Sequence, residues 1–149
     1  MKIAVVGTGM IAREALTALQ QVEGIEVVTI CARPHSRDKA RALAQEFGVP
    51  QVATDYGAML AAHEADFVYI GIVNSAHFDY ARQAIAAGWH VILEKPFTST
   101  LAEAEELIAR ARAAHCYLFE AVTPLFLPNY VGILEALPQL GLIRLVQAN

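Results

Sequence analysis

The segment Gly7-Thr8-Gly9-Met10-Ile11-Ala12 constrains the fold of this chain more than any other feature. It follows an apolar run at residues 2–7 and opens an amphipathic stretch at 10–21, which predicts a buried strand, a tight turn and a helix. In this G-x-G-x-x-A pattern the first glycine permits the turn, the second keeps the backbone accessible, and the alanine lets the helix approach the sheet. The N-terminus of such a helix attracts anions, so the pattern predicts a pyrophosphate-binding loop. The alternative is a tight turn that binds no ligand.

Strand-like and helix-like stretches alternate along the rest of the chain. Further strands are expected at 25–31, 51–53, 66–71, 89–94, 116–121 and 143–148, and helices at 36–47, 55–63, 75–87, 100–114 and 125–137. This alternation predicts an α/β chain with a doubly wound Rossmann fold and a mostly parallel sheet. Thr100 and Glu103 have the spacing of a capping box at the start of their helix.

Composition excludes several classes of protein. Of the 149 residues 56% are hydrophobic, which is enough for a core, and 11 Lys and Arg against 15 Asp and Glu give a net charge of −4. The acidic balance argues against nucleic-acid binding, and no apolar stretch approaches the roughly 20 residues of a membrane span. Cys31 and Cys116 lie in apolar runs and are expected to be buried free thiols, which indicates a reducing, cytoplasmic location. The histidines lack metal-ligand spacing, so no metal site is expected.

The end of the second predicted strand bears on cofactor choice. A site for NAD would place a carboxylate here to bind the ribose 2′-hydroxyl, but the sequence reads Cys-Ala-Arg-Pro-His-Ser-Arg over residues 31–37. Arg33 and Arg37 could pair with a 2′-phosphate, which favours NADP over NAD. The alternative is that both arginines are solvated surface charges.

A second cluster of polar residues follows the strands at 66–71 and 89–94. Glu94, Lys95 and Pro96 end the latter, and Asn74 and His77 follow the former. Functional groups of open α/β sheets collect at these carboxyl ends. Lys95 is therefore a candidate proton donor or acceptor, with an ordinary surface lysine as the alternative.

These motifs together resemble the N-terminal half of the glucose-fructose oxidoreductase / inositol dehydrogenase (Gfo/Idh/MocA) family. The resemblance covers essentially the whole chain. It rests on Gly7-x-Gly9-x-x-Ala12, Ala44-Gln45-Glu46-Phe47-Gly48, Asp66-x-Val68-Tyr69-Ile70, Asn74-x-x-His77, Ala87-Gly88-Trp89-His90-Val91, Glu94-Lys95-Pro96, Leu118-Phe119-Glu120-Ala121 and Gly141-Leu142-Ile143-Arg144. Through Tyr69-Ile70-Gly71, Phe119-Glu120-Ala121 and Ala32-Arg33 it leans toward the branch of dimeric dihydrodiol dehydrogenase and NADP-linked xylose dehydrogenase.

The resemblance implies hydride transfer between NADP or NAD and a hydroxyl carbon of a sugar, cyclitol or diol. Lys95 would be catalytic and His77 would border the substrate pocket, unless it is a helix-surface residue. Glu94 would lie on the cofactor side, with an ion pair to Lys95 as the alternative. The expected cofactor-binding residues are Gly7, Thr8, Gly9, Met10, Ile11, Ala12, Arg33, Arg37, Ile72, Asn74 and Glu94.

Members of this family are about twice as long as this chain. We therefore expect a Rossmann domain at 1–121, and at 122–149 a helix and first strand that lead into an open-sheet substrate domain missing here. Such a chain would be nearly inactive alone; the alternative is a stand-alone, non-catalytic NAD(P)-binding or sensor module. Apolar residues around Phe126 and Tyr130 would then be exposed and favour self-association.

Overall fold

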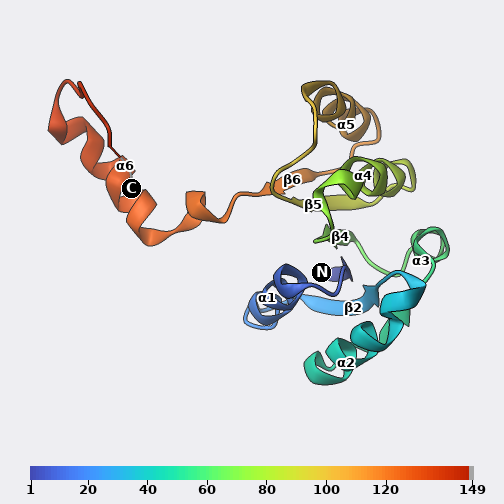
Figure 1. Ribbon diagram of the computed structural model, residues 1–149. Helices are drawn as coiled ribbons and strands as arrows, with labels where there is room; N and C mark the ends of the chain where they lie inside the picture. The colour runs from blue at the N-terminus through green and yellow to red at the C-terminus, as the bar shows by residue number, and fades with distance from the viewer. Residues whose placement is uncertain (148–149) are drawn as a thin grey trace.

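Six parallel strands form one sheet in the order β3-β2-β1-β4-β5-β6, in a computed structural model that describes residues 1–147 (Figure 1). The strands are β1 (Lys2–Val6), β2 (Glu26–Cys31), β3 (Gln51–Ala53), β4 (Phe67–Ile70), β5 (His90–Glu94) and β6 (Leu118–Ala121). The helices are α1 (Met10–Leu19), α2 (Arg37–Phe47), α3 (Tyr56–Ala62), α4 (His77–Ala86), α5 (Leu101–Ala113) and α6 (Pro128–Ala136). The chain order reverses between β1 and β4, which is the switch point of a doubly wound sheet. The predicted fold class is confirmed.

Helices cover both faces because each buried strand presents apolar side chains alternately to either side. On one face, side chains of α1 and α2 pack against Ile3, Val5 and Ile30. On the other face, α4 and α5 pack against Val68 and Val91 together with their strand neighbours. The parallel register, with Val5 opposite Tyr69 and Tyr69 opposite Ile92, brings the carboxyl ends of the central strands to one edge.

Local signals place the helix boundaries. The Thr100 hydroxyl accepts a hydrogen bond from the Glu103 N–H, and the Glu103 carboxylate accepts one from the Thr100 N–H at 3.1 Å, which confirms the capping box. Asp55 caps α3 by accepting from the Ala58 N–H at 2.9 Å. The helices predicted at 36–47 and 75–87 each begin with a short 3-10 turn, η1 (Pro34–Ser36) and η2 (Asn74–Ala76).

The segment after β6 extends away from the sheet (Figure 1). The helix predicted at 125–137 is divided into η3 (Thr123–Phe126), α6 and η4 (Leu137–Leu140), because the residue before Pro128 takes an extended conformation. No residue of α6 is buried. The strand predicted at 143–148 is wrong for residues 143–147, and Ala148 lies outside the described residues. A strand needs a neighbour for its backbone hydrogen bonds, and no described strand adjoins these residues.

The two cysteines differ in burial. Cys31 is buried at the end of β2 as predicted, whereas Cys116 is only partly buried, because it lies in the turn before the edge strand β6; that part of the prediction is wrong. In residues 1–147 no helix has the length and apolarity to cross a membrane.

Candidate functional site

The turn between β1 and α1 is shaped by two glycines with different surroundings. Gly7 has a φ of +128°, and a Cβ there would overlap the main-chain carbonyl oxygen of Gly71. Its N–H donates to the Cys31 carbonyl at 2.9 Å. Gly9 is the N-cap residue of α1, and a Cβ on it would meet no atom within 4 Å. Gly7 is therefore required by the fold, whereas Gly9 leaves open space in front of the helix.

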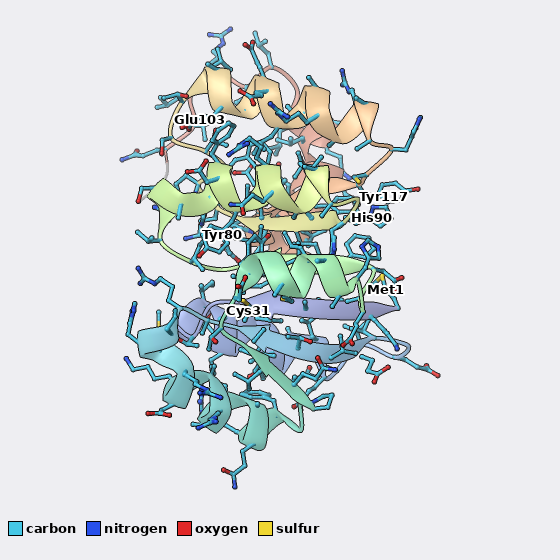
Figure 2. All side chains as sticks on the ribbon, turned by 90° about the vertical axis from the view of Figure 1, so that its right-hand side faces the viewer. Met1, Cys31, Tyr80, His90, Glu103 and Tyr117 are labelled. Carbon is cyan, nitrogen blue, oxygen red and sulfur yellow. The ribbon has the colours of Figure 1, made fainter. Side chains whose placement is uncertain are left out.

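A cavity of about 520 Å³ lies in front of this turn, at the carboxyl ends of β1, β2 and β4. Figure 2 labels two of its lining residues, Cys31 at the end of β2 and Tyr80 on α4. The lining residues are Val6, Gly7, Thr8, Gly9, Ile11, Cys31, Ala32, Arg33, Pro34, Ser36, Thr54, Tyr56, Gly71, Ile72, Val73, Ala76 and Tyr80. The structure thus brings six predicted cofactor-binding residues to one cavity: Gly7, Thr8, Gly9, Ile11, Arg33 and Ile72.

The other predicted cofactor-binding residues lie around this cavity and do not line it. Met10 directs its side chain to solvent, with 77% of it exposed, and Ala12 is fully buried behind the turn. Arg37 is the first residue of α2 and is exposed, while Ser36 beside it lines the cavity. Asn74 begins η2 and is exposed.

Two tyrosines form a wall of the cavity that the sequence interpretation missed. The rings of Tyr56 and Tyr80 lie 4.5 Å apart between centroids, and the Tyr56 hydroxyl donates to the Tyr80 carbonyl at 2.9 Å. Burial raises the pKa of the Tyr56 phenol, and the nearby Cys31 and Tyr80 raise it further. The available signal was that Tyr56 begins the helix that follows the predicted strand at 51–53; no such signal marked Tyr80.

Buried Cys31 contributes its side chain to the same cavity. Burial, followed by the charge of Asp55, raises the pKa of its thiol to about 11. The thiol is therefore neutral at physiological pH and acts as a small apolar group in the lining.

Glu94 and Lys95 separate at the end of β5. The Glu94 side chain is only 7% exposed, and its Oε1 accepts a hydrogen bond of 2.6 Å from the Tyr69 hydroxyl. Its Oε2 accepts from the Lys95 main-chain N–H at 3.1 Å. Lys95 is exposed, and its ammonium group pairs with no carboxylate among residues 1–147. The alternative reading of a Glu94–Lys95 ion pair is therefore not what the structure shows.

His77 lies beneath the site with no exposed surface. Its Nδ1 lies 2.9 Å from the Pro96 carbonyl oxygen and its Nε2 3.3 Å from the Ile72 carbonyl oxygen. The ring thus connects the loop after β4 to the loop after β5. Its expected role at a substrate pocket stays a prediction, since the imidazole does not line the cavity.

The residues present fit a dinucleotide. The first turn of α1 carries no acidic side chain, a Cβ on its N-cap residue Gly9 would meet open space, and Arg33 lines the same cavity. No group of three or more His, Cys, Asp or Glu side chains in the described part of the chain is placed to hold a metal ion. The fold and the site together define a dinucleotide-binding Rossmann domain.

Comparison with known proteins identifies the family. The sequence profile of the Gfo/Idh/MocA oxidoreductases, described as an oxidoreductase family with an NAD-binding Rossmann fold, matches residues 1–122. The chain belongs to this family and carries its NAD(P)-binding domain.

Curated relatives and solved structures agree with this assignment. The chain is 30% identical to scyllo-inositol 2-dehydrogenase (NADP(+)) IolU of Bacillus subtilis over 149 residues, 100% of this chain and 45% of that protein. It is 27% identical to trans-1,2-dihydrobenzene-1,2-diol dehydrogenase of Xenopus laevis, over 99% of this chain and 46% of that protein. KijD10, a 3-ketoreductase from Actinomadura kijaniata crystallised with TDP-benzene and NADP, is 31% identical and superposes with a TM-score of 0.86, over 93% of this chain and 43% of that one. The chain thus spans less than half the length of these relatives.

Proposed function

We propose that this chain supplies the cofactor-binding part of an oxidoreductase that acts on a hydroxyl carbon of a sugar, cyclitol or diol. The carrying observation is an exposed lysine with no ion-pair partner among residues 1–147, at the carboxyl end of β5 in an NAD(P)-binding fold. The inositol and diol substrates in the names of two relatives support this substrate class.

In this proposal a bound nicotinamide would supply the hydride chemistry, and Lys95 transfers the proton. The Lys95 ammonium group donates a proton to a carbonyl oxygen during reduction, and the neutral amine accepts it from the alcohol during oxidation. Glu94 and Asn74 lie on the cofactor side, and His77, itself buried, supports the substrate pocket from beneath by joining the loops after β4 and β5. The chain alone turns over slowly, because Lys95 is exposed to water and lies outside the lined cavity, whereas catalysis needs an assembled pocket.

We propose further that the cofactor is NADP. Arg33 lines the cavity at the end of β2, and no carboxylate follows that strand before α2. Asp or Glu at this place would bind the ribose hydroxyl of NAD, whereas arginine suits the additional phosphate of NADP. The NADP in the name of IolU and in the KijD10 crystals supports this choice.

Titration calorimetry of the purified chain with NADPH and NADH tests the proposal. We expect clear binding of NADPH and at least tenfold weaker binding of NADH, with Gly9→Ala as a matched variant that weakens both. Tighter binding of NADH would refute the NADP preference. Absence of heat with either nucleotide, from a folded sample, would refute an autonomous cofactor domain.

We also propose a domain boundary near residue 121, a cytoplasmic location, and self-association through the segment that follows β6. The last is supported by an exposed apolar segment, the tail surface, made of Leu125, Phe126, Leu127, Tyr130 and Val131. Exposed apolar area of this extent favours association in water. The location is supported by two free thiols in a chain whose cysteines are not paired.

A further inference from the structure

We infer that Tyr69 is a positioning residue that fixes the Glu94–Lys95 turn at the end of β5. The relevance to catalysis rests on the proposed role of Lys95, but the positioning itself is a property of this chain. Three contacts carry it: the Tyr69–Glu94 hydrogen bond, the Glu94–Lys95 hydrogen bond and the close approach of the Tyr69 ring to Gly71.

The strand register explains how the tyrosine reaches the carboxylate. Tyr69 lies opposite Ile92 in the β4–β5 pair, and Ile70 opposite Leu93. Continuing this register, Glu94 stands level with Gly71, two residues beyond Tyr69 on the same face of the sheet. The Tyr69 side chain must therefore lean along its strand to reach Glu94.

Gly71 provides the space for that lean. A Cβ on Gly71 would lie 2.8 Å from Cε1 of Tyr69 and 3.3 Å from a methyl carbon of Ile11. Any larger residue would displace the ring from its path toward Glu94. The absence of a side chain at Gly71 thus leaves room for the Tyr69–Glu94 contact.

Both carboxyl oxygens of Glu94 are hydrogen-bonded. Glu94 receives one donor on each carboxylate oxygen, the Tyr69 hydroxyl on Oε1 and the Lys95 N–H on Oε2. Tyr69 and Glu94 are each only 7% exposed, so their hydrogen bond is shielded from water. Without the hydroxyl, the buried Glu94 side chain would keep a single described partner and would turn toward water, because an unsatisfied buried polar group is costly.

The consequence reaches Lys95 through the main chain. While Tyr69 binds one carboxyl oxygen of Glu94, the other oxygen accepts a hydrogen bond from the Lys95 N–H. This second bond fixes the direction of the main chain at Lys95 after the strand. Tyr69 therefore acts on the site without touching substrate or cofactor itself, through an ordered chain from Gly71 to Tyr69 to Glu94 to Lys95.

Amide hydrogen exchange of the ¹⁵N-labelled full chain measures this directly. In Tyr69→Phe we expect the Lys95 N–H to exchange about tenfold faster, while the amides within β5 keep their protection. A downfield hydroxyl proton signal from Tyr69 is expected in the wild type and should be lost in Tyr69→Phe.

Tyr56→Phe is the matched control. It also removes a buried tyrosine hydroxyl that donates to a described acceptor, but that acceptor is the Tyr80 carbonyl. We expect it to leave Lys95 exchange unchanged. An unchanged Lys95 rate in Tyr69→Phe, or an equal increase in both variants, would overturn the inference.

A second variant protects the test against failure of the first to fold. Gly71→Ala keeps the hydroxyl but displaces the ring, and it should also speed Lys95 exchange; normal exchange with the hydroxyl signal retained would again overturn the inference. Nucleotide titration of the wild type is separate. If the chain binds neither NADPH nor NADH, the proposed function fails, and Lys95 exchange still decides the role of Tyr69.

Discussion

Gly7 and Gly71 pass so closely that a Cβ on Gly7 would overlap the Gly71 carbonyl oxygen. The contact joins the turn between β1 and α1 to the residue that follows β4. The glycine loop and the loop that leads to His77 therefore start at the same close backbone contact. Glycine at position 7 is also required by its φ of +128°. Gly7 is thus the structural glycine of the motif, whereas Gly9, whose Cβ would meet open space, is the one expected to serve binding.

Gly7→Ala and Gly9→Ala should therefore behave differently. We expect Gly7→Ala to lower the free energy of unfolding by about 2 kcal/mol or more, through backbone strain and overlap. Gly9→Ala should cost less than about 1 kcal/mol, since its Cβ meets open space, but should weaken dinucleotide binding at least tenfold. Urea unfolding and nucleotide titration of both variants check this, and equal stability losses would contradict the division of roles.

Arg33 should determine the preference between the two nucleotides. Removing a charge-assisted hydrogen bond costs about 1.5–3 kcal/mol, so Arg33→Ala should weaken NADPH binding by roughly 10- to 100-fold and leave NADH binding little changed. Arg41→Ala is the control, because Arg41 is exposed on α2 and does not line the cavity. An equal loss for both nucleotides in Arg33→Ala would show that the guanidinium does not bind the 2′-phosphate.

Much of the fold could be predicted because its signals are local. The glycine loop, the capping box at Thr100 and the alternation of strands and helices each depend on neighbouring residues. The strand expected at 143–148 failed in its described part because pairing depends on a distant partner. The Tyr56–Tyr80 wall and the burial of His77 were missed for the same reason, since each joins separate elements whose distance no sequence pattern states.

His77 should contribute strongly to stability. His77→Ala would leave a void in the core and remove the imidazole that lies between the Ile72 and Pro96 carbonyls, at a cost of about 2–4 kcal/mol in the free energy of unfolding. His35→Ala is the control: His35 is exposed, and its loss should change stability by less than about 0.5 kcal/mol. Similar values for the two variants in guanidinium unfolding would contradict a connecting role for His77.

Cys31 should make the fold less stable in alkaline solution. The unfolded thiol has a pKa of 9.0 and the folded one of about 11, so the folded chain holds this proton more tightly. The contribution of this thiol to the free energy of unfolding is complete below pH 9 and is lost as the pH rises from 9 to 11. The loss amounts to about 1 kcal/mol between pH 8 and pH 10. Unfolding curves at the two pH values should show a smaller decrease for Cys31→Ala than for the wild type. Cys116→Ala, at a partly buried thiol, should retain most of the wild-type decrease.

The tail surface should govern association of the chain. Phe126 is 79% exposed and Tyr130 36% exposed. They belong to the segment after β6, which extends away from the sheet (Figure 1). Joint replacement of Phe126 and Tyr130 by Ser should weaken self-association at least tenfold in sedimentation velocity over a concentration series, because aromatic residues dominate such contacts. Val22→Ser removes an exposed apolar side chain elsewhere and should leave association unchanged. If the wild type stays monomeric throughout the series, or if both variants associate like it, the tail surface is not the contact.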